Sequence, residues 1–156
     1  MKLTICAVGR LRQGPEADLI DDYLTRATRT GRALGLGPAT VSEVEDKKGG
    51  GMTAQAQLLE NALPQNAKII ALDERGKLLT SPDFAKQLAL WRDEGIRDTA
   101  FVIGGADGIA PSLRKRADLT LSFGKMVWPH MLARTMLAEQ IYRATTILAS
   151  SPYHRL

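Results

Sequence analysis

Three side chains at the end of the chain carry the chemistry of an active site. Tyr153, His154 and Arg155 place a phenol, an imidazole and a guanidinium in succession. Imidazole is the side chain that most often moves protons in enzymes, and guanidinium binds phosphate and other anions. The last residues of a chain are also commonly frayed. The residue types alone therefore leave a functional tail and a frayed terminus both open.

A glycine-rich loop is the second candidate for chemistry. Gly104-Gly105-Ala106-Asp107-Gly108 follows the apolar run Phe101–Ile103. Glycine has no Cβ, so main-chain N–H and C=O groups can approach a ligand closely. Alanine stands where the dinucleotide fingerprint requires its second glycine, and no Walker lysine motif is present. The loop predicts a backbone-lined pocket and gives no support to hydride or phosphoryl transfer.

Metal and thiol chemistry are not expected. Two scattered histidines and one cysteine do not supply a zinc constellation, and Cys6 lies in an apolar stretch. A single cysteine is typical of a reducing compartment. No apolar run approaches the ~20 residues that span a bilayer. These features predict a cytoplasmic protein without a membrane segment or a metal.

The charge is concentrated in the last third of the chain. The whole sequence carries a net charge of +4, but residues 109–156 carry +5 and the remainder −1. The basic excess therefore lies in the same third as the tail and follows the glycine loop directly. This distribution favours a polyanionic partner near the ligand site, although a basic surface that serves only solubility remains open.

The elements that must position these residues alternate between strands and helices. Apolar runs predict strands at 3–8, 39–44, 68–72, 100–103 and 119–123. Helical spacing predicts helices from Pro15, over 55–63, from Ser81 as N-cap, after Pro111 and over 130–149. The Asp73–Gly76 stretch predicts a turn, and residues 47–51 predict a flexible loop. The alternation predicts an α/β fold, with a mainly parallel sheet covered by helices on both faces.

Four segments together resemble a known family. They are LDERGK (Leu72 to Lys77), FVIGGADG (Phe101 to Gly108), the run from Leu121 to Ala144, and PYHR (Pro152 to Arg155). They resemble the large-subunit (23S) ribosomal RNA methyltransferases that modify N3 of a pseudouridine, which belong to the SPOUT superfamily. The resemblance implies a single domain over residues 1–156 with a C-terminal trefoil knot. It further implies S-adenosylmethionine as cofactor, a homodimer, and the ribosome as partner.

The resemblance also implies a set of site residues. The cofactor would contact Leu72, Gly104 and Gly105, and the segment Phe123, Gly124, Lys125, Met126, Val127 and Trp128. Tyr153, His154 and Arg155 would be catalytic. Two features depart from the family pattern. Ala106-Asp107 replaces the Pro-Glu of many relatives, and Trp128 is larger than the usual residue there.

A mechanism follows from the resemblance as a hypothesis. His154 would assist deprotonation of N3 or bind phosphate, and Tyr153 would orient the base, with the tail supplied by the partner subunit. Arg155, together with Arg134 or Arg143, would stabilise the imide anion or hold RNA phosphate. Two alternatives remain at this point: a non-catalytic RNA-binding module, and a nucleotide-using enzyme of ordinary doubly wound fold.

Overall fold

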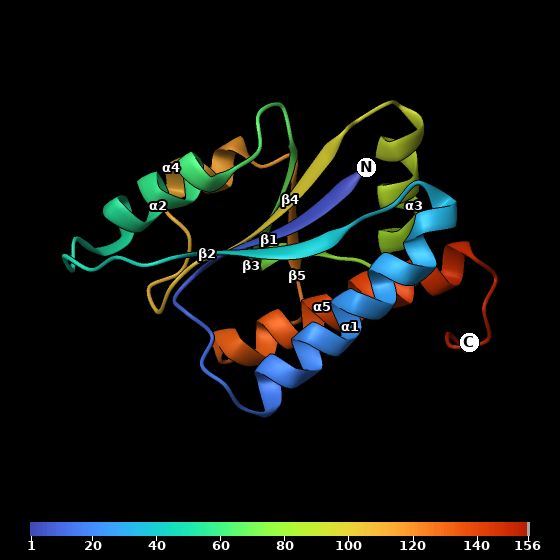
Figure 1. The fold of residues 1–156 in the computed structure, drawn as a ribbon. Helices are drawn as coiled ribbons and strands as arrows, with labels where there is room; N and C mark the ends of the chain where they lie inside the picture. The colour runs from blue at the N-terminus through green and yellow to red at the C-terminus, as the bar shows by residue number, and fades with distance from the viewer. Residues whose placement is uncertain (156) are drawn as a thin grey trace.

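The computed structural model describes residues 1–155 and shows a parallel sheet covered by helices on both faces (Figure 1). The strand order is β2-β1-β4-β3-β5, and every neighbouring pair is parallel. The strands are β1 (Lys2–Val8), β2 (Ala39–Val44), β3 (Lys68–Leu78), β4 (Asp98–Ile103) and β5 (Leu119–Ser122). The predicted α/β class with a parallel sheet is confirmed.

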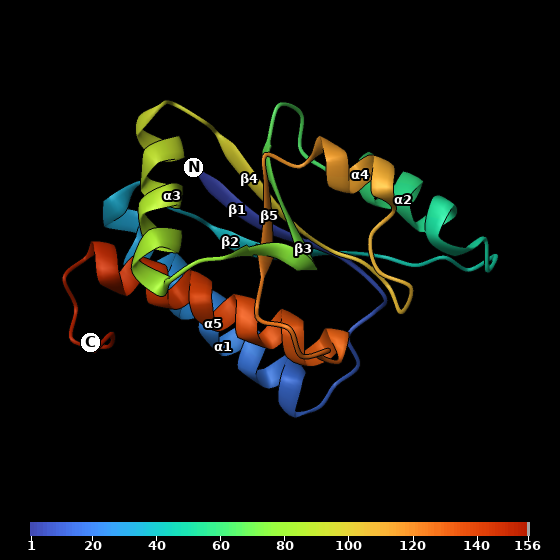
Figure 2. The same ribbon diagram turned by 180° about the vertical axis from the view of Figure 1, so that it is seen from behind.

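The helices divide into two layers. One face carries α1 (Pro15–Gly31), α3 (Ser81–Asp93) and α5 (His130–Leu148), and the other carries α2 (Gly51–Ala62) and α4 (Pro111–Arg116) (Figure 2). A short 3₁₀ helix, η1 (Arg32–Leu34), follows α1. Helices α1 and α5 lie side by side along their length in both ribbon views.

Two hydrophobic cores form because side chains alternate across each strand. Leu3, Ile5 and Ala7 of β1 pack toward α1, α3 and α5, whereas Cys6 and Val8 pack toward α2 and α4. Strand β4 divides its side chains in the same way. Trp91 of α3 is 6% exposed and packs in the larger core.

Strand β3 is longer than the sequence predicted. It pairs with β5 through Leu72, shifts register between Leu72 and Lys77, and pairs again to Leu78. The predicted turn at Asp73–Gly76 is therefore a bulge within a strand. A Cβ at Gly76 would lie 2.7 Å from backbone atoms of Thr120 and Leu121. Glycine is needed there because the bulge passes so close to β5.

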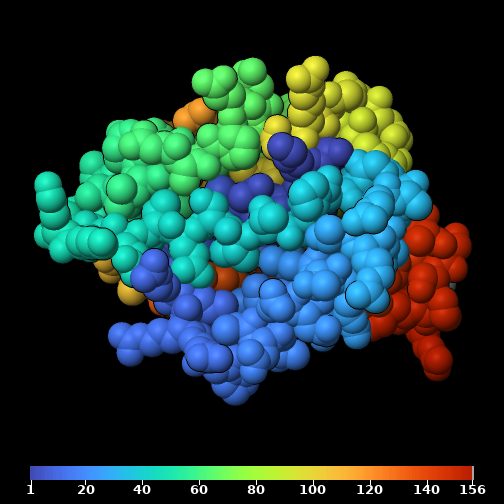
Figure 3. Space-filling model, viewed as in Figure 1, coloured from blue at the N-terminus to red at the C-terminus, as the bar shows by residue number. Residues whose placement is uncertain are grey.

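Two helix starts also differ from the prediction. Thr80, not Ser81, caps α3, because its hydroxyl accepts a 3.2 Å hydrogen bond from the Asp83 N–H. The Ser81 hydroxyl instead donates to Gln140 of α5. Helix α2 begins at Gly51, so it takes in part of the predicted glycine loop. Figure 3 shows the remaining loop projecting from the surface at the opposite end of the molecule from the C-terminal segment.

Within residues 1–155 no helix is long and apolar enough to cross a membrane. The trefoil knot and the domain limits of 1–156 stay predictions of the family resemblance.

Candidate active site

A pocket of about 390 Å³ lies beside the bulge in β3, the carboxyl ends of β4 and β5, and the first turn of α5. Ligands of open α/β sheets bind at this edge, and the volume falls in the range of ~300–1,000 Å³ for small-molecule sites. The pocket brings together eight of the nine residues predicted to contact a cofactor: Leu72, Gly104, Gly105, Phe123, Gly124, Met126, Val127 and Trp128. Lys125, the ninth, is exposed and does not line it.

The glycine loop is folded tightly on itself at the pocket wall. The Gly108 N–H donates to the Gly105 carbonyl at 2.9 Å and closes a turn. A Cβ at Gly104 would collide with the backbone of Gly108 and Ile109, and one at Gly105 would meet the Gln55 side chain at 2.7 Å. Close packing against backbone therefore requires glycine at 104, whereas a Cβ at 105 would meet the movable end of the Gln55 side chain. Both residues line the pocket.

The charged groups in the pocket wall are acidic. Asp73 and Glu74 line it, and His130 of α5 is the other titratable side chain there among residues 1–155. The Asp73 side chain is 5% exposed and accepts hydrogen bonds from Arg75 and, at 3.3 Å, from Arg114 of α4. Hydrogen bonds from Arg75 lower the pKa of Asp73 to about 2. Because two arginines pair with Asp73, Glu74 is the carboxylate in this wall that can complement a cationic ligand.

The mouth of the pocket is apolar and exposed. Met126, Val127 and Trp128 of the β5–α5 loop are 72%, 82% and 41% exposed, and Leu132 of α5 is 41% exposed. Met126, Val127 and Trp128 also line the pocket. Large apolar side chains gathered at one place on a surface are typical of a site that a ligand or another chain covers.

Arg134 does not belong to a surface that could hold RNA. Its side chain is fully buried, ion-paired with Glu43 at 3.1 Å, and donates to the carbonyls of Val8 and Gly9. The prediction that Arg134 could bind phosphate is therefore wrong. The arginine instead ties the first turns of α5 to the ends of β1 and β2, next to Ala133 and His130 in the pocket wall.

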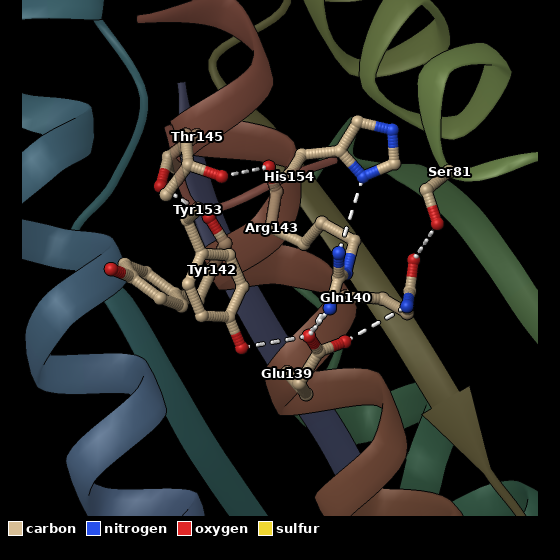
Figure 4. A network of polar contacts seen from close by, with 9 residues as sticks. Ser81, Glu139, Gln140, Tyr142, Arg143, Thr145, Tyr153 and His154 are labelled. Atoms are coloured by element: carbon tan, nitrogen blue, oxygen red, sulfur yellow. Dashed lines mark hydrogen bonds and ion pairs between the residues drawn. The ribbon is translucent and has the colours of Figure 1, made fainter. Parts of the chain in front are cut away.

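The tail packs against the middle of α5. The Tyr153 hydroxyl donates to Glu139 at 3.0 Å, and its ring lies 4.7 Å from the Tyr142 ring. Arg143 lies 3.2 Å from Nδ1 of His154 and stacks over the Tyr153 ring (Figure 4). Burial, and then the Glu139 carboxylate, raise the pKa of Tyr153 to about 12, so the phenol keeps its proton at neutral pH. Arg155 is exposed.

The tail and the pocket are separated within one chain. The pocket touches α5 at His130 and Ala133, whereas Tyr153 and His154 bind its residues 139 and 143. At ~1.5 Å per residue, the two places lie on the order of 10–20 Å apart along the helix axis. The structure thus groups the predicted cofactor residues and groups the tail, but it does not bring the two groups together.

Sequence reasoning missed two residues near these sites. Asp73 directly follows the predicted Leu72, and its acidity at a strand end was a usable signal. Glu139 stands four residues before Arg143, a spacing that favours an ion pair on a helix, and the pair forms at 2.6 Å. Its bond to Tyr153 had no signal in the sequence.

Other reactive groups do not form a site. Among residues 1–155 no three His, Cys, Asp or Glu side chains lie where they could share a metal ion. Burial raises the pKa of the Cys6 thiol to about 11, so it is protonated and unreactive at neutral pH.

Comparisons with known proteins agree on one family. Residues 1–154 match a family model described as predicted SPOUT methyltransferase. Ribosomal RNA large subunit methyltransferase H of Ruegeria sp. (strain TM1040) is 69% identical over 156 residues, covering 100% of both chains. The protein of that name from Paracoccus denitrificans (strain Pd 1222) is 68% identical over 155 residues, covering 99% of each. A methylase family structure from Neisseria gonorrhoeae shares the fold with a TM-score of 0.50 at 16% identity, covering 99% of this chain and 86% of that one.

Proposed function

Because the chain belongs to the SPOUT methyltransferase family, we propose that it methylates N3 of a pseudouridine in large-subunit (23S) ribosomal RNA, using S-adenosylmethionine. The observation that carries this proposal is the 69% identity, over the full length of both chains, to a ribosomal RNA large subunit methyltransferase H. Family membership leaves no support for a non-catalytic RNA-binding module or for a nucleotide-using enzyme of doubly wound fold.

The pocket fits the proposed cofactor. S-adenosylmethionine supplies an electrophilic methyl group on a positively charged sulfonium and carries an ammonium group. Glu74 in the wall complements such charges, while Leu72, Phe123 and Trp128 offer apolar contact. Main-chain groups of the glycine loop, which lines the pocket at Gly104 and Gly105, would hydrogen-bond polar edges of the ligand.

The acceptor requires a proton to leave. N3 of pseudouridine is an imide nitrogen that carries a proton, and it becomes a strong nucleophile as that proton is removed. His154 would take the proton or hold an RNA phosphate, and Arg155 would stabilise the imide anion. Tyr153 keeps its hydroxyl proton, so it serves to orient groups and not as a base.

The tail would act on the pocket of a second copy of the chain. One chain holds its own tail on the order of 10–20 Å along α5 from its pocket, too far for the same side chains to reach a ligand there. Symmetric dimers are the commonest soluble assemblies. The exposed apolar side chains at the pocket mouth provide a surface that a partner could cover. A homodimer with composite sites would join the two groups.

The decisive experiment measures methyl transfer from labelled S-adenosylmethionine to three acceptors: assembled 70S ribosomes, free large-subunit RNA, and ribosomes that lack pseudouridine. Label only in pseudouridine-containing ribosomes is the expected result. Label in free RNA would show that the reaction does not require an assembled ribosome. Label in ribosomes without pseudouridine would refute the proposed acceptor.

Deletion of residues 153–156 tests the tail. The shortened protein should bind S-adenosylmethionine like the intact protein, measured by calorimetry, because the tail does not line its own pocket. It should transfer no methyl group. Methylation at the normal rate would show that Tyr153, His154 and Arg155 are not catalytic.

A further inference from the structure

Glu139 is the centre of the polar network that holds the tail (Figure 4). Its Oε1 accepts hydrogen bonds from Arg143 at 2.9 and 2.6 Å and from the Tyr153 hydroxyl at 3.0 Å. Its Oε2 accepts from Gln140 at 2.8 Å. The side chain is 18% exposed. One carboxylate therefore meets donors from its own helix and from the tail.

The network extends from Glu139 in two directions. Toward the C-terminus, Arg143 approaches Nδ1 of His154 and lies 4.9 Å from the centre of the Tyr153 ring. Toward the core, Gln140 accepts a 2.7 Å hydrogen bond from Ser81 at the start of α3. The side chains of Tyr153 and His154 are thus linked to a helix that is fixed in the fold.

Such an anchor is needed because the tail follows a helix end and would otherwise fray. Ordering it costs backbone and side-chain entropy, which hydrogen bonds to a charged acceptor can offset. The Glu139 carboxylate bonds directly to Tyr153 and orients Arg143, which contacts both Tyr153 and His154.

We propose that Glu139 is a positioning residue for methyl transfer, which holds the tail of its own chain in the shape that the partner's pocket requires. This inference rests on the proposed function. Glu139 does not line the pocket of about 390 Å³ and acts through Tyr153 and Arg143. Its loss should lower kcat and leave the affinity for S-adenosylmethionine unchanged.

Glu139→Gln is the first variant, because it keeps the shape and removes the negative charge to which Arg143, Tyr153 and Gln140 donate. Small misplacement of groups can cost up to ~10²-fold in rate, so we expect a fall in kcat of about 10- to 100-fold. Tyr153→Phe removes only the hydroxyl that Glu139 binds. The two losses should be strongly non-additive in the double variant, as expected for groups that act as a unit.

Glu60→Gln is the matched control. Glu60 lies on α2 and meets Arg116 at 4.0 Å, far from the tail network. It should keep full activity. If Glu139→Gln also keeps the normal kcat while tail deletion abolishes activity, the inference is overturned and the proposed function stands. If tail deletion has no effect, the proposed roles of the tail fail instead.

Mixed dimers decide whether Glu139 acts through the tail. One subunit carries Gly104→Trp, which blocks its pocket, and the other carries Glu139→Gln, with separate affinity tags for purification. The intact pocket then faces the intact tail of the other chain. Activity near half that of wild type is expected, since one of two symmetric sites is complete.

An inactive mixed dimer would overturn the inference. It would mean that Glu139 serves its own subunit, where it also lines a second cavity of about 420 Å³ with Ser81 and Gln140. Calorimetry with S-adenosylmethionine and size-exclusion chromatography check that each variant is folded and dimeric. Tyr153→Phe provides an independent test should Glu139→Gln fail to fold.

Discussion

Arg134→Met should destabilise the fold markedly without a direct effect on RNA contacts. The arginine is fully buried, and its guanidinium joins Glu43 to the carbonyls of Val8 and Gly9. Methionine fills much of the same volume but donates no hydrogen bond. The variant leaves two carbonyl groups and a carboxylate without this donor.

The size of the effect follows from these contacts. Removing one partner of a buried ion pair costs about 3–5 kcal/mol. Two features reduce this value. The Glu43 side chain is 26% exposed and also accepts from the Leu11 N–H. The Nε of Arg134 is itself buried without a partner, so its removal relieves a cost of about 1 kcal/mol. We expect a net loss of about 2 to 3 kcal/mol, which lowers Tm by about 4 to 12 °C in a chain of this size.

Urea unfolding followed by circular dichroism measures this loss, with Arg116→Met as the control. Arg116 is 58% exposed and pairs at 4.0 Å, so its replacement should cost less than about 0.5 kcal/mol. A loss below about 1 kcal/mol for Arg134→Met would refute the structural role. If Arg134 contacted phosphate, its replacement would instead reduce the slope of log binding constant against log salt concentration for the ribosome by about 1. We do not expect this change.

Three further variants test the pocket. Gly104→Ala should abolish S-adenosylmethionine binding in calorimetry because its Cβ meets backbone, whereas Gly14→Ala, whose Cβ meets only a side-chain oxygen at 3.8 Å, should bind normally. The pKa of Asp73 is lowered to about 2 in the folded state, so its contribution is present above the usual pKa and is lost as pH falls toward 2. In Asp73→Asn the free energy of unfolding should therefore fall less steeply as pH decreases toward 2, with a difference from wild type of at most about 2 kcal/mol. An unchanged pH dependence would contradict this. Cofactor binding should alter tryptophan fluorescence in Trp91→Phe but not in Trp128→Phe, because only Trp128 lines the pocket.

Local patterns in the sequence were sufficient to predict the parallel sheet and the glycine loop of the pocket wall, whereas the family resemblance supplied the other expected cofactor contacts. The apolar runs of β1 and of Phe101–Ile103 depend only on neighbouring residues. Strand ends of a parallel sheet meet at one edge, which explains why the loops that follow β4 and β5 lie together. The structure places them together in one pocket.

Features that depend on distant partners could not be predicted in this way. The burial of Arg134 is set by Glu43, which lies 91 residues away in the chain. The Asp73–Gly76 stretch has residue types that are typical of turns, but pairing with β5 on both sides makes it part of a strand. Thr80 and Ser81 are equally good caps by residue type, and the bond from Ser81 to Gln140 decides between them.

Helix α5 limits where residues can be inserted into or deleted from the chain. Its first turn lines the pocket, and its residues 139 and 143 hold the tail, with no loop between the two places. Inserting or deleting one residue between Ala133 and Glu139 would rotate the tail by about 100° around the helix axis and shift it by about 1.5 Å. The length and rotation of this helical segment therefore fix the position of the tail relative to the pocket of the same chain. Changes in length should be tolerated in the loop around residues 47–50, which projects from the far end of the molecule, and not within this stretch of α5.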